Sequence, residues 1–200
     1  MSIKNLGIIG GGQLGSLLAV AAKKLNINTI IYCDDADAPA QNFCNKFIHG
    51  RYDDKVKMHE FIKEIDVITY EFENIPYETL NEMNKVKPVL PKPSVNRLIQ
   101  HRIAEKDFVN KLNIRTTRYA SIENKSDMEP LGDFLPGILK TTTMGYDGKG
   151  QYPIKKIEDI NNLNIDFSKG YILEKLVKLK KEISVLSLIH ISEPTRRIHI

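Results

Sequence analysis

The chain is organised around Lys140-Thr-Thr-Thr-Met-Gly-Tyr-Asp-Gly-Lys-Gly-Gln151, which joins a strand to a loop that can hold an anion. The apolar run Phe134-Leu-Pro-Gly-Ile-Leu139 before it predicts a short buried strand. The three glycines of the loop permit positive φ angles and close approach of a bound group, and consecutive N–H groups can bind an anion there. The loop lacks a Gly-Lys-Ser/Thr ending, so it is not a Walker A loop. A glycine-rich hairpin turn is the alternative interpretation.

The composition indicates an ordinary globular chain. Its 200 residues are 42% hydrophobic and 27% charged, with a net charge of +4. The lysines are scattered, which argues against a nucleic-acid partner and suits anionic small molecules. Cys33 and Cys44 form no CxxC pair, so neither zinc nor a disulfide framework is predicted. Without a signal-peptide pattern or an apolar span of about eighteen residues, we expect a cytoplasmic protein with no membrane partner.

The first forty residues read as a strand, a glycine turn, a helix and a second strand. Leu6-Gly-Ile-Ile9 leads into Gly10-Gly-Gly-Gln-Leu-Gly15, and Thr29-Ile-Ile-Tyr-Cys33 is followed by Asp34-Asp35. The G-x-G-x-x-G pattern opens a helix whose N-terminus offers free N–H groups to a phosphate, and an acidic pair about twenty residues on fits a dinucleotide fingerprint. We expect one apolar stripe of this helix to face the core: Leu14, Leu17, Leu18, Ala21, Ala22 and Leu25.

A further unit places carboxylates after a strand. Phe47-Ile-His49 is a short strand, Asp53 can cap the next helix, and Val67-Ile-Thr-Tyr70 is a strand that ends in Glu71-Phe-Glu-Asn74. Open α/β sheets bind ligands at the carboxyl ends of their strands. Glu71 or Glu73 could therefore contact a substrate amine or hydroxyl, with solvated carboxylates as the alternative.

The Pro-rich segment Val89-Leu-Pro-Lys-Pro93 predicts a domain boundary. Ser94 then caps one helix that runs to Leu112, in which Arg102 and Lys106 lie four residues apart, as a phosphate clamp or as two surface cations. Beyond it we expect strands at 117–120 and 171–177, a polar loop or short helix at 124–132, and a short helix at 157–163.

The final stretch, 186–200, sustains neither a helical nor an alternating pattern and resembles the translated read-through of a sequencing-library adapter. We interpret it as a non-native or disordered tail. The hypothesis is that authentic sequence stops near Val185 and that the chain is a fragment.

Five motifs together resemble the ATP-grasp superfamily and, within it, the 5-(carboxyamino)imidazole ribonucleotide synthases of purine biosynthesis. They occur in the family's order: Gly10–Gly15, Tyr70-Glu-Phe-Glu-Asn74, Arg102-x-x-x-Lys106, Lys140 with Gly145–Gln151, and Glu174-Lys-Leu-Val177 with Glu182. The resemblance implies an α/β fold. A Rossmann-like parallel sheet of pre-ATP-grasp type covers 1–93, and the first part of an ATP-grasp domain covers 94–185. The family usually has an acidic residue where this chain has His101.

The resemblance also implies two groups of site residues. Lys140 and Arg102 would bring positive charge to the ATP phosphates, residues 174–177 would offer their backbone to adenine, and Glu182 would take the ribose hydroxyls. The ATP-binding group is Arg102, Lys140, Gly145, Tyr146, Asp147, Gly148, Lys149, Gly150, Gln151, Glu174, Lys175, Leu176, Val177 and Glu182. The substrate-binding group is Gly12, Gln13, Leu14, Gly15 and Glu73, with the ribose phosphate held in the first glycine turn.

The implied reaction joins bicarbonate to 5-aminoimidazole ribonucleotide at the expense of ATP, through carboxyphosphate, giving ADP and phosphate. In the family the Mg²⁺ ligands and the catalytic residues lie in a C-terminal part with no counterpart in these 200 residues. We therefore expect no metal site within this chain, an inactive chain by itself, and a homodimer for the full-length protein. Alternatives are an NAD-binding Rossmann oxidoreductase, which explains only residues 1–35, another ATP-grasp carboxylase or ligase, and a non-catalytic nucleotide-binding regulator.

Overall fold

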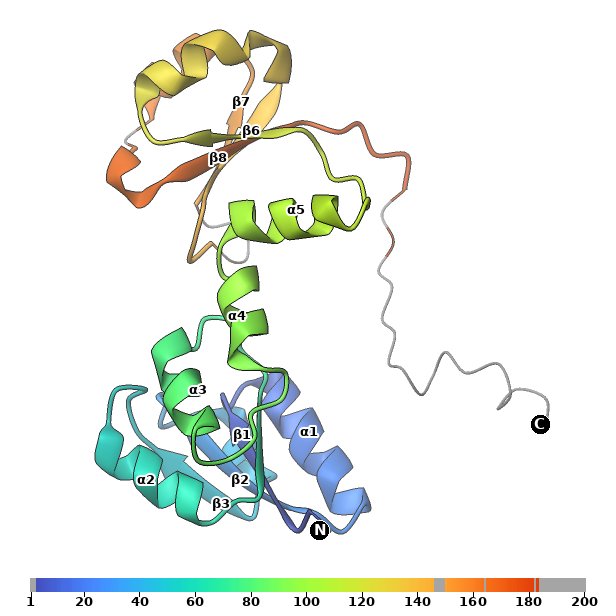
Figure 1. Cartoon of the computed structure of the whole chain (residues 1–200), viewed down its shortest axis with the longest axis vertical. Coiled ribbons are helices and arrows are strands. Elements are labelled where there is room, and N and C mark those ends of the chain that lie inside the picture. The colour runs from blue at the N-terminus through green and yellow to red at the C-terminus, as the bar shows by residue number, and fades with distance from the viewer. Residues whose placement is uncertain (1–2, 146–149, 164, 182, 184–200) are drawn as a thin grey trace, which may run out of the picture.

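A computed structural model describes residues 3–145, 150–163, 165–181 and 183, and shows two sheets joined by two helices (Figure 1). The predicted α/β class is confirmed. The first sheet lies at one end of the molecule and the second at the other, with α4 and α5 between them (Figure 1). Residues 146–149 and 182 of the predicted nucleotide site, and the predicted tail from 186 onward, lie outside the described residues.

The N-terminal sheet is entirely parallel, with the strand order β3-β2-β1-β4. Its strands are β1 (Asn5–Ile9), β2 (Asn28–Cys33), β3 (Lys46–His49) and β4 (Val67–Tyr70). The connecting elements are α1 (Gln13–Lys24), the 3-10 turn η1 (Pro39–Asn42), α2 (Lys55–Lys63) and α3 (Tyr77–Asn84).

Alternation along the strands supplies two apolar faces, as expected for a parallel sheet covered on both sides. Ile9, Ile30 and Tyr32 pack with the α2 and α3 residues Phe61, Leu80 and Met83. The other face is built from small residues: Ile8, Ile31 and Cys33 pack with Ala19, Ala38 and Ala40. Because these alanines have short side chains, α1 and η1 can lie close against the sheet.

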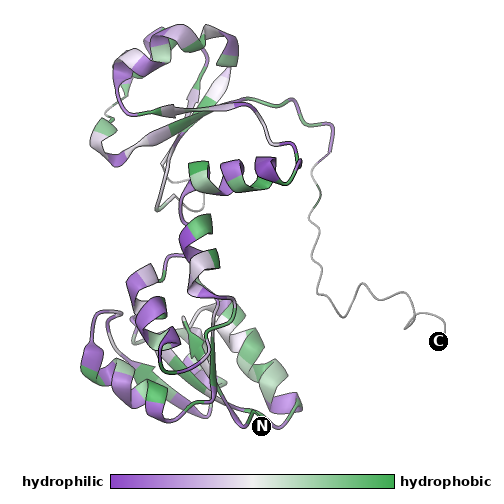
Figure 2. Ribbon diagram, in the orientation of Figure 1, coloured by the Kyte–Doolittle hydropathy of each residue, from purple (hydrophilic) through white to green (hydrophobic). Residues whose placement is uncertain are grey.

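The predicted apolar stripe of α1 was wrong. The buried residues of the helix are Gly15, Ser16, Ala19 and Ala22, whereas Leu14 and Leu17 are each 57% exposed and Leu25 is 71% exposed. Of the six predicted positions only Ala22 is buried. The leucines are displaced because close packing on the sheet admits only small side chains. Hydrophobic residues are therefore visible along much of α1 in Figure 2.

Two helix boundaries also differ from expectation. Asp54, not Asp53, caps α2 by accepting from Val56 N and Lys57 N, while Asp53 pairs with Arg51. The single helix predicted from Ser94 to Leu112 is two helices, α4 (Pro93–Ile99) and α5 (Arg102–Lys111). His101 occupies the break and caps α5, its Nδ1 accepting from Ala104 N at 3.4 Å. His101 therefore satisfies one of the N–H groups at the start of α5, as an N-cap side chain does.

The second sheet is antiparallel, with the order β5-β8-β6-β7. Its strands are β5 (Tyr119–Ile122), β6 (Gly137–Thr141), β7 (Gln151–Ile154) and β8 (Tyr171–Lys175), and its 3-10 turns are η2 (Lys125–Phe134), η3 (Ile157–Asn162) and η4 (Phe167–Lys169). Strand β5 begins two residues later than predicted, and β7 was not predicted. One core, centred on Leu139, Ile154 and Leu173, lies under the turns.

The boundary near residue 93 stays a proposal. In the part of the chain that the structure describes, no helix is long and apolar enough to span a bilayer.

Candidate functional site

A buried cluster of three charges lies on the second sheet, next to the strand that leads into the glycine loop. Glu174 of β8 bridges two lysines: its Oε2 lies 2.7 Å from Lys140 Nζ of β6, and its Oε1 lies 3.2 Å from Lys106 Nζ of α5. The three side chains are 10%, 18% and 17% exposed respectively. In the β6–β8 register Ile138 faces Glu174 and Lys140 faces Ile172, so Lys140 and Glu174 are diagonal neighbours on one face.

The cluster carries one net positive charge. Burial by itself would raise the pKa of Glu174, but the hydrogen bond and charge of Lys140, together with the charge of Lys106, outweigh it and lower the pKa below the ordinary 4.5. Glu174 is therefore ionised near neutrality and neutralises one of the two lysines.

These residues line a cavity of about 330 Å³ beside α5, and Arg102 lies on its wall. The sequence-predicted residues Arg102, Lys140 and Glu174 are thus brought together with Lys106, although they come from three elements. Sequence reasoning missed the remaining lining residues Glu105, Val109 and Thr116, which carry no motif.

Arg102 holds the end of β6 through hydrogen bonds to backbone carbonyl groups, so part of its guanidinium is already used within the protein. Its Nε donates to Thr141 O at 3.1 Å, its Nη2 donates to Gly145 O at 2.6 Å, and its backbone N donates to Thr142 O. A guanidinium has five N–H donors, so others remain for a ligand. Arg102 therefore holds the loop entrance as well as bringing charge to it.

The described ends of the glycine loop have special backbone geometry. Gly150 has a φ of +68°, and a Cβ there would lie 2.8 Å from Thr141 Oγ1, so glycine is required. Before the loop, Met144 takes a positive φ of 58°. Gln151 faces Lys140 in the β6–β7 register.

The predicted adenine hinge already uses part of its backbone within the protein. Lys175 N donates to Arg118 O, Leu176 N donates to Pro136 O, and Lys175 O accepts from Thr117 Oγ1. Leu176 and Val177 are 50% and 53% exposed. Backbone groups of Leu176 and Val177 not used in these bonds are the ones that an adenine ring could contact.

A second group of predicted residues lies at the carboxyl ends of the parallel strands. Gly12 N donates to Glu71 Oε1 at 2.8 Å, so the position predicted for a substrate phosphate holds a carboxylate of the protein itself. Gln13 and Leu14 are exposed, and Gly15 is buried.

Glu73 is held on the same loop by amides of α4 and the residue after it. Gln100 Nε2 donates to both Glu73 O and Ile75 O at 2.7 Å, and Asn96 Nδ2 donates to Glu73 O at 2.9 Å. These two amides fix the backbone of the loop, and the carboxylate of Glu73 remains exposed. No sequence motif had indicated that Asn96 or Gln100 would support this loop.

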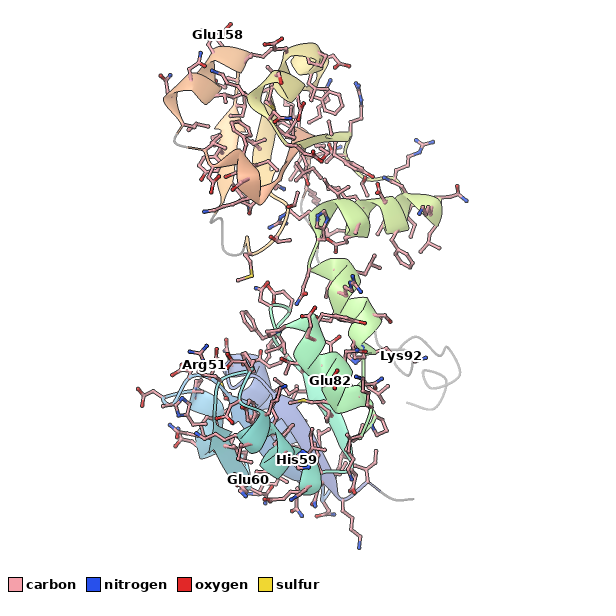
Figure 3. All side chains as sticks on the ribbon, turned by 60° about the vertical axis from the view of Figure 1, so that its left-hand side comes forward. Arg51, His59, Glu60, Glu82, Lys92 and Glu158 are labelled. Carbon is pink, nitrogen blue, oxygen red and sulfur yellow. The ribbon has the colours of Figure 1, made fainter. Side chains whose placement is uncertain are left out.

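The two groups meet at one cavity of about 120 Å³. It is lined by Glu73 and Asn74 from the loop after β4, by residues 142–145 after β6, by Arg102 of α5, and by Ile99 and Gln100 at the end of α4. Figure 3 shows the labelled Glu158 at the end of the molecule formed by the second sheet, and the labelled Arg51 and Glu82 on the half that contains the first sheet. Within the described ranges no group of three or more His, Cys, Asp or Glu side chains gathers as a metal site.

A parallel sheet with a glycine turn, followed by an antiparallel sheet with a second glycine loop, is the arrangement that two family models match. The ribonucleotide synthetase preATP-grasp domain matches residues 3–100, and the ATP-grasp domain matches residues 107–197, a range that extends past Val185. The chain belongs to the ATP-grasp superfamily.

Named relatives agree with the narrower resemblance predicted from the motifs. N5-carboxyaminoimidazole ribonucleotide synthase of Brucella melitensis biotype 1 is 36% identical over 187 residues, covering 91% of this chain and 52% of the relative. The bifunctional purine synthesis protein purC/E of Dictyostelium discoideum is 35% identical, covering 90% of this chain and 19% of that protein. The resemblance to carboxyaminoimidazole ribonucleotide synthases is confirmed.

A solved structure extends the likeness to three dimensions. N5-carboxyaminoimidazole synthetase from Staphylococcus aureus complexed with ADP superimposes with a TM-score of 0.82 at 30% identity, covering 88% of this chain and 48% of that one. The chain thus spans about half the length of the synthases that it matches.

Proposed function

We propose that this chain carries the nucleotide-binding and aminoribonucleotide-binding parts of an ATP-dependent carboxylase. The reaction converts ATP, bicarbonate and 5-aminoimidazole ribonucleotide into 5-(carboxyamino)imidazole ribonucleotide, ADP and phosphate. ATP phosphorylates a bicarbonate oxygen to form carboxyphosphate. The substrate amine then attacks its carbon, phosphate leaves, and the amine loses a proton.

The observation that supports this most strongly is the 120 Å³ cavity between the two sheets. Glu73 from the proposed substrate loop, Gly145 from the proposed ATP loop, and Arg102 at the start of α5 line it together. A ligase needs its activated intermediate and its amine at one place, because a short-lived acyl phosphate is otherwise lost to water.

The lysine–glutamate cluster provides the proposed binding of ATP. Lys140 and Lys106 border the 330 Å³ cavity and supply positive charge for phosphates, while Glu174 keeps them apart and ordered before the nucleotide arrives. The ATP-binding and substrate-binding residues assigned from sequence are retained as proposals, including 146–149 and Glu182.

Mg²⁺ belongs to the proposal, and the prediction that its protein ligands lie outside these 200 residues remains a prediction. The homodimer and the cytoplasmic location predicted from sequence remain predictions.

The test is ADP binding to the 200-residue chain by calorimetry. Lys140→Ala should weaken binding by about 2–3 kcal/mol, the range for losing a hydrogen bond to a charged group, or roughly 30- to 160-fold. Lys155→Ala is the matched control, because Lys155 is an exposed lysine of the same sheet. Failure of the wild-type chain to bind ADP, or equal affinity in both variants, would contradict the proposal.

NADH titration by fluorescence tests the alternative. A Rossmann oxidoreductase should bind NADH in the micromolar range through the first sheet. We expect no such binding, because Glu71 fills the glycine turn where a pyrophosphate would lie.

A further inference from the structure

The glycine turn after β1 contains an anion supplied by the protein. Glu71 Oε1 accepts from Gly12 N at 2.8 Å, at the N-terminus of the twelve-residue helix α1. That N–H group belongs to the set that a G-x-G-x-x-G turn offers to a phosphate.

The glycines of the turn are shaped around this carboxylate. Gly10 has a φ of +98°, and a Cβ there would lie 2.8 Å from Glu71 Oε1; a Cβ on Gly12 would lie 3.1 Å from the same atom. The missing side chains at Gly10 and Gly12 therefore make room for the Glu71 side chain. Gly15 is needed for a different close contact, because a Cβ added there would lie 2.9 Å from Gly10 O.

The backbone places Glu71 there without a loop rearrangement. Glu71 N donates to Ile9 O at 3.1 Å, so the residue continues the pairing of β4 with β1. Because β4 is the neighbour of β1, its first residue past the strand reaches the turn directly. On the other side of β1 the strand β2 is followed by Asp34 and Asp35.

We propose that Glu71 is a specificity-determining residue: it occupies the anion site of the glycine turn and excludes phosphate groups from it. The proposal deepens the proposed function, because it assigns the aminoribonucleotide's phosphate to a position outside this turn. A group with hydrogen-bond donors, such as a hydroxyl or an amine, matches the carboxylate edge that the turn presents. The phosphate assignment made from the glycine pattern is thereby revised.

The experiment titrates the ¹⁵N-labelled 200-residue chain with inorganic phosphate and, separately, with ribose 5-phosphate, and follows the Gly12 amide by NMR. In the wild type, the chemical shift of the Gly12 amide should show no saturable change with inorganic phosphate or with ribose 5-phosphate. Glu71→Ala empties the site, and the same amide should then shift saturably with added phosphate, as for an open backbone nest. Glu78→Ala, at an exposed carboxylate of α3, is the control and should behave like the wild type.

A saturable response of wild-type Gly12 would overturn the proposal, as would a Glu78→Ala response equal to that of Glu71→Ala. A folded Glu71→Ala chain that ignores phosphate would also overturn it. Should Glu71→Ala fail to fold, the shorter side chain of Glu71→Ser is titrated in the same way, and indifference of that folded variant to phosphate would overturn the proposal. ADP binding at Lys140 is measured separately, so failure of the proposed function is distinguishable.

Discussion

Glu71 and Glu174 are both carboxylates at the end of a strand beside a glycine loop, yet their surroundings are opposite. Glu71 accepts from the neutral backbone N–H of Gly12, and among the described residues no ion pair is formed by its carboxylate. Glu174 is 10% exposed and lies between two lysines. Glycines indicate where the backbone comes close to another group, whereas the neighbouring charges decide whether that group can be an added anion. The first loop is thus closed to phosphate, and the second has positive charge left for it.

The largest effect is expected for Glu174→Ala. It leaves two lysines buried without their partner, and breaking such a pair costs about 3–5 kcal/mol in a fully buried site. Because these side chains keep some exposure, we expect a loss of about 2–4 kcal/mol in the free energy of unfolding, measured with urea. Glu158→Ala, at an exposed carboxylate in the 3-10 turn η3 that follows β7, is the control. A loss below about 1 kcal/mol would mean that solvent already screens the cluster.

The second-largest loss of stability is expected for Gly15→Ala. The glycine motif suggests a need for close approach of a phosphate, but the structure shows a close contact within the protein. The added Cβ would meet Gly10 O at 2.9 Å, a backbone atom that cannot move cheaply, and overpacking of this kind costs about 1–3 kcal/mol. Gly132→Ala is the matched control, since a Cβ there has no neighbour within 4 Å. Equal urea midpoints for the two variants would refute tight packing of α1 on the turn.

Glu71→Ala should cost less than Glu174→Ala, because it removes one charged acceptor from a half-exposed amide and strands no buried charge. We expect about 1–2 kcal/mol, the lower part of the range for hydrogen bonds to charged groups. Thermal unfolding of the two variants measured side by side checks the order. A reversed order would overturn the contrast between the two carboxylates.

The pH dependence of unfolding sharpens the same contrast. The pKa of Glu174 is lowered in the folded state, so the unfolded chain binds the proton more readily. The cluster's contribution is therefore fully present above 4.5, the ordinary pKa, and is lost as the pH falls through the lowered value. Urea midpoints of the wild type should fall over this range more steeply than those of Glu174→Gln, and parallel curves would contradict the assignment.

The smallest effect is expected for Leu17→Gln on the outer side of α1. Leu17 is 57% exposed, and substitutions at such sites usually change stability by less than about 0.5 kcal/mol. Ala19→Leu, on the buried side, should instead destabilise by about 1–3 kcal/mol through overpacking. The predicted leucine stripe would be right after all if Leu17→Gln proved the more damaging.

Much of the fold was readable from local pattern. Apolar runs placed β1, β2 and β4, and the order of the glycine turn, the two carboxylates and the later lysine indicated the superfamily. Predictions failed where one local sequence pattern was compatible with two different structures. The leucines of α1 form a regular stripe, but the alanine stripe beside it is the one that fits against the sheet. One apolar helix pattern after Ser94 became two helices, because His101 caps a new one.

The sequence by itself determined the classes of element, their order and the family, because these depend on periodicity and on motifs close together in the chain. Only the tertiary structure decided which groups meet. Lys106, Lys140 and Glu174 come from three elements, and Glu71 reaches Gly12 across 59 residues because β4 pairs with β1. Charge acts through space and not along the chain. The glycine pattern therefore could not show that one loop already contained its anion while the other was bordered by lysines.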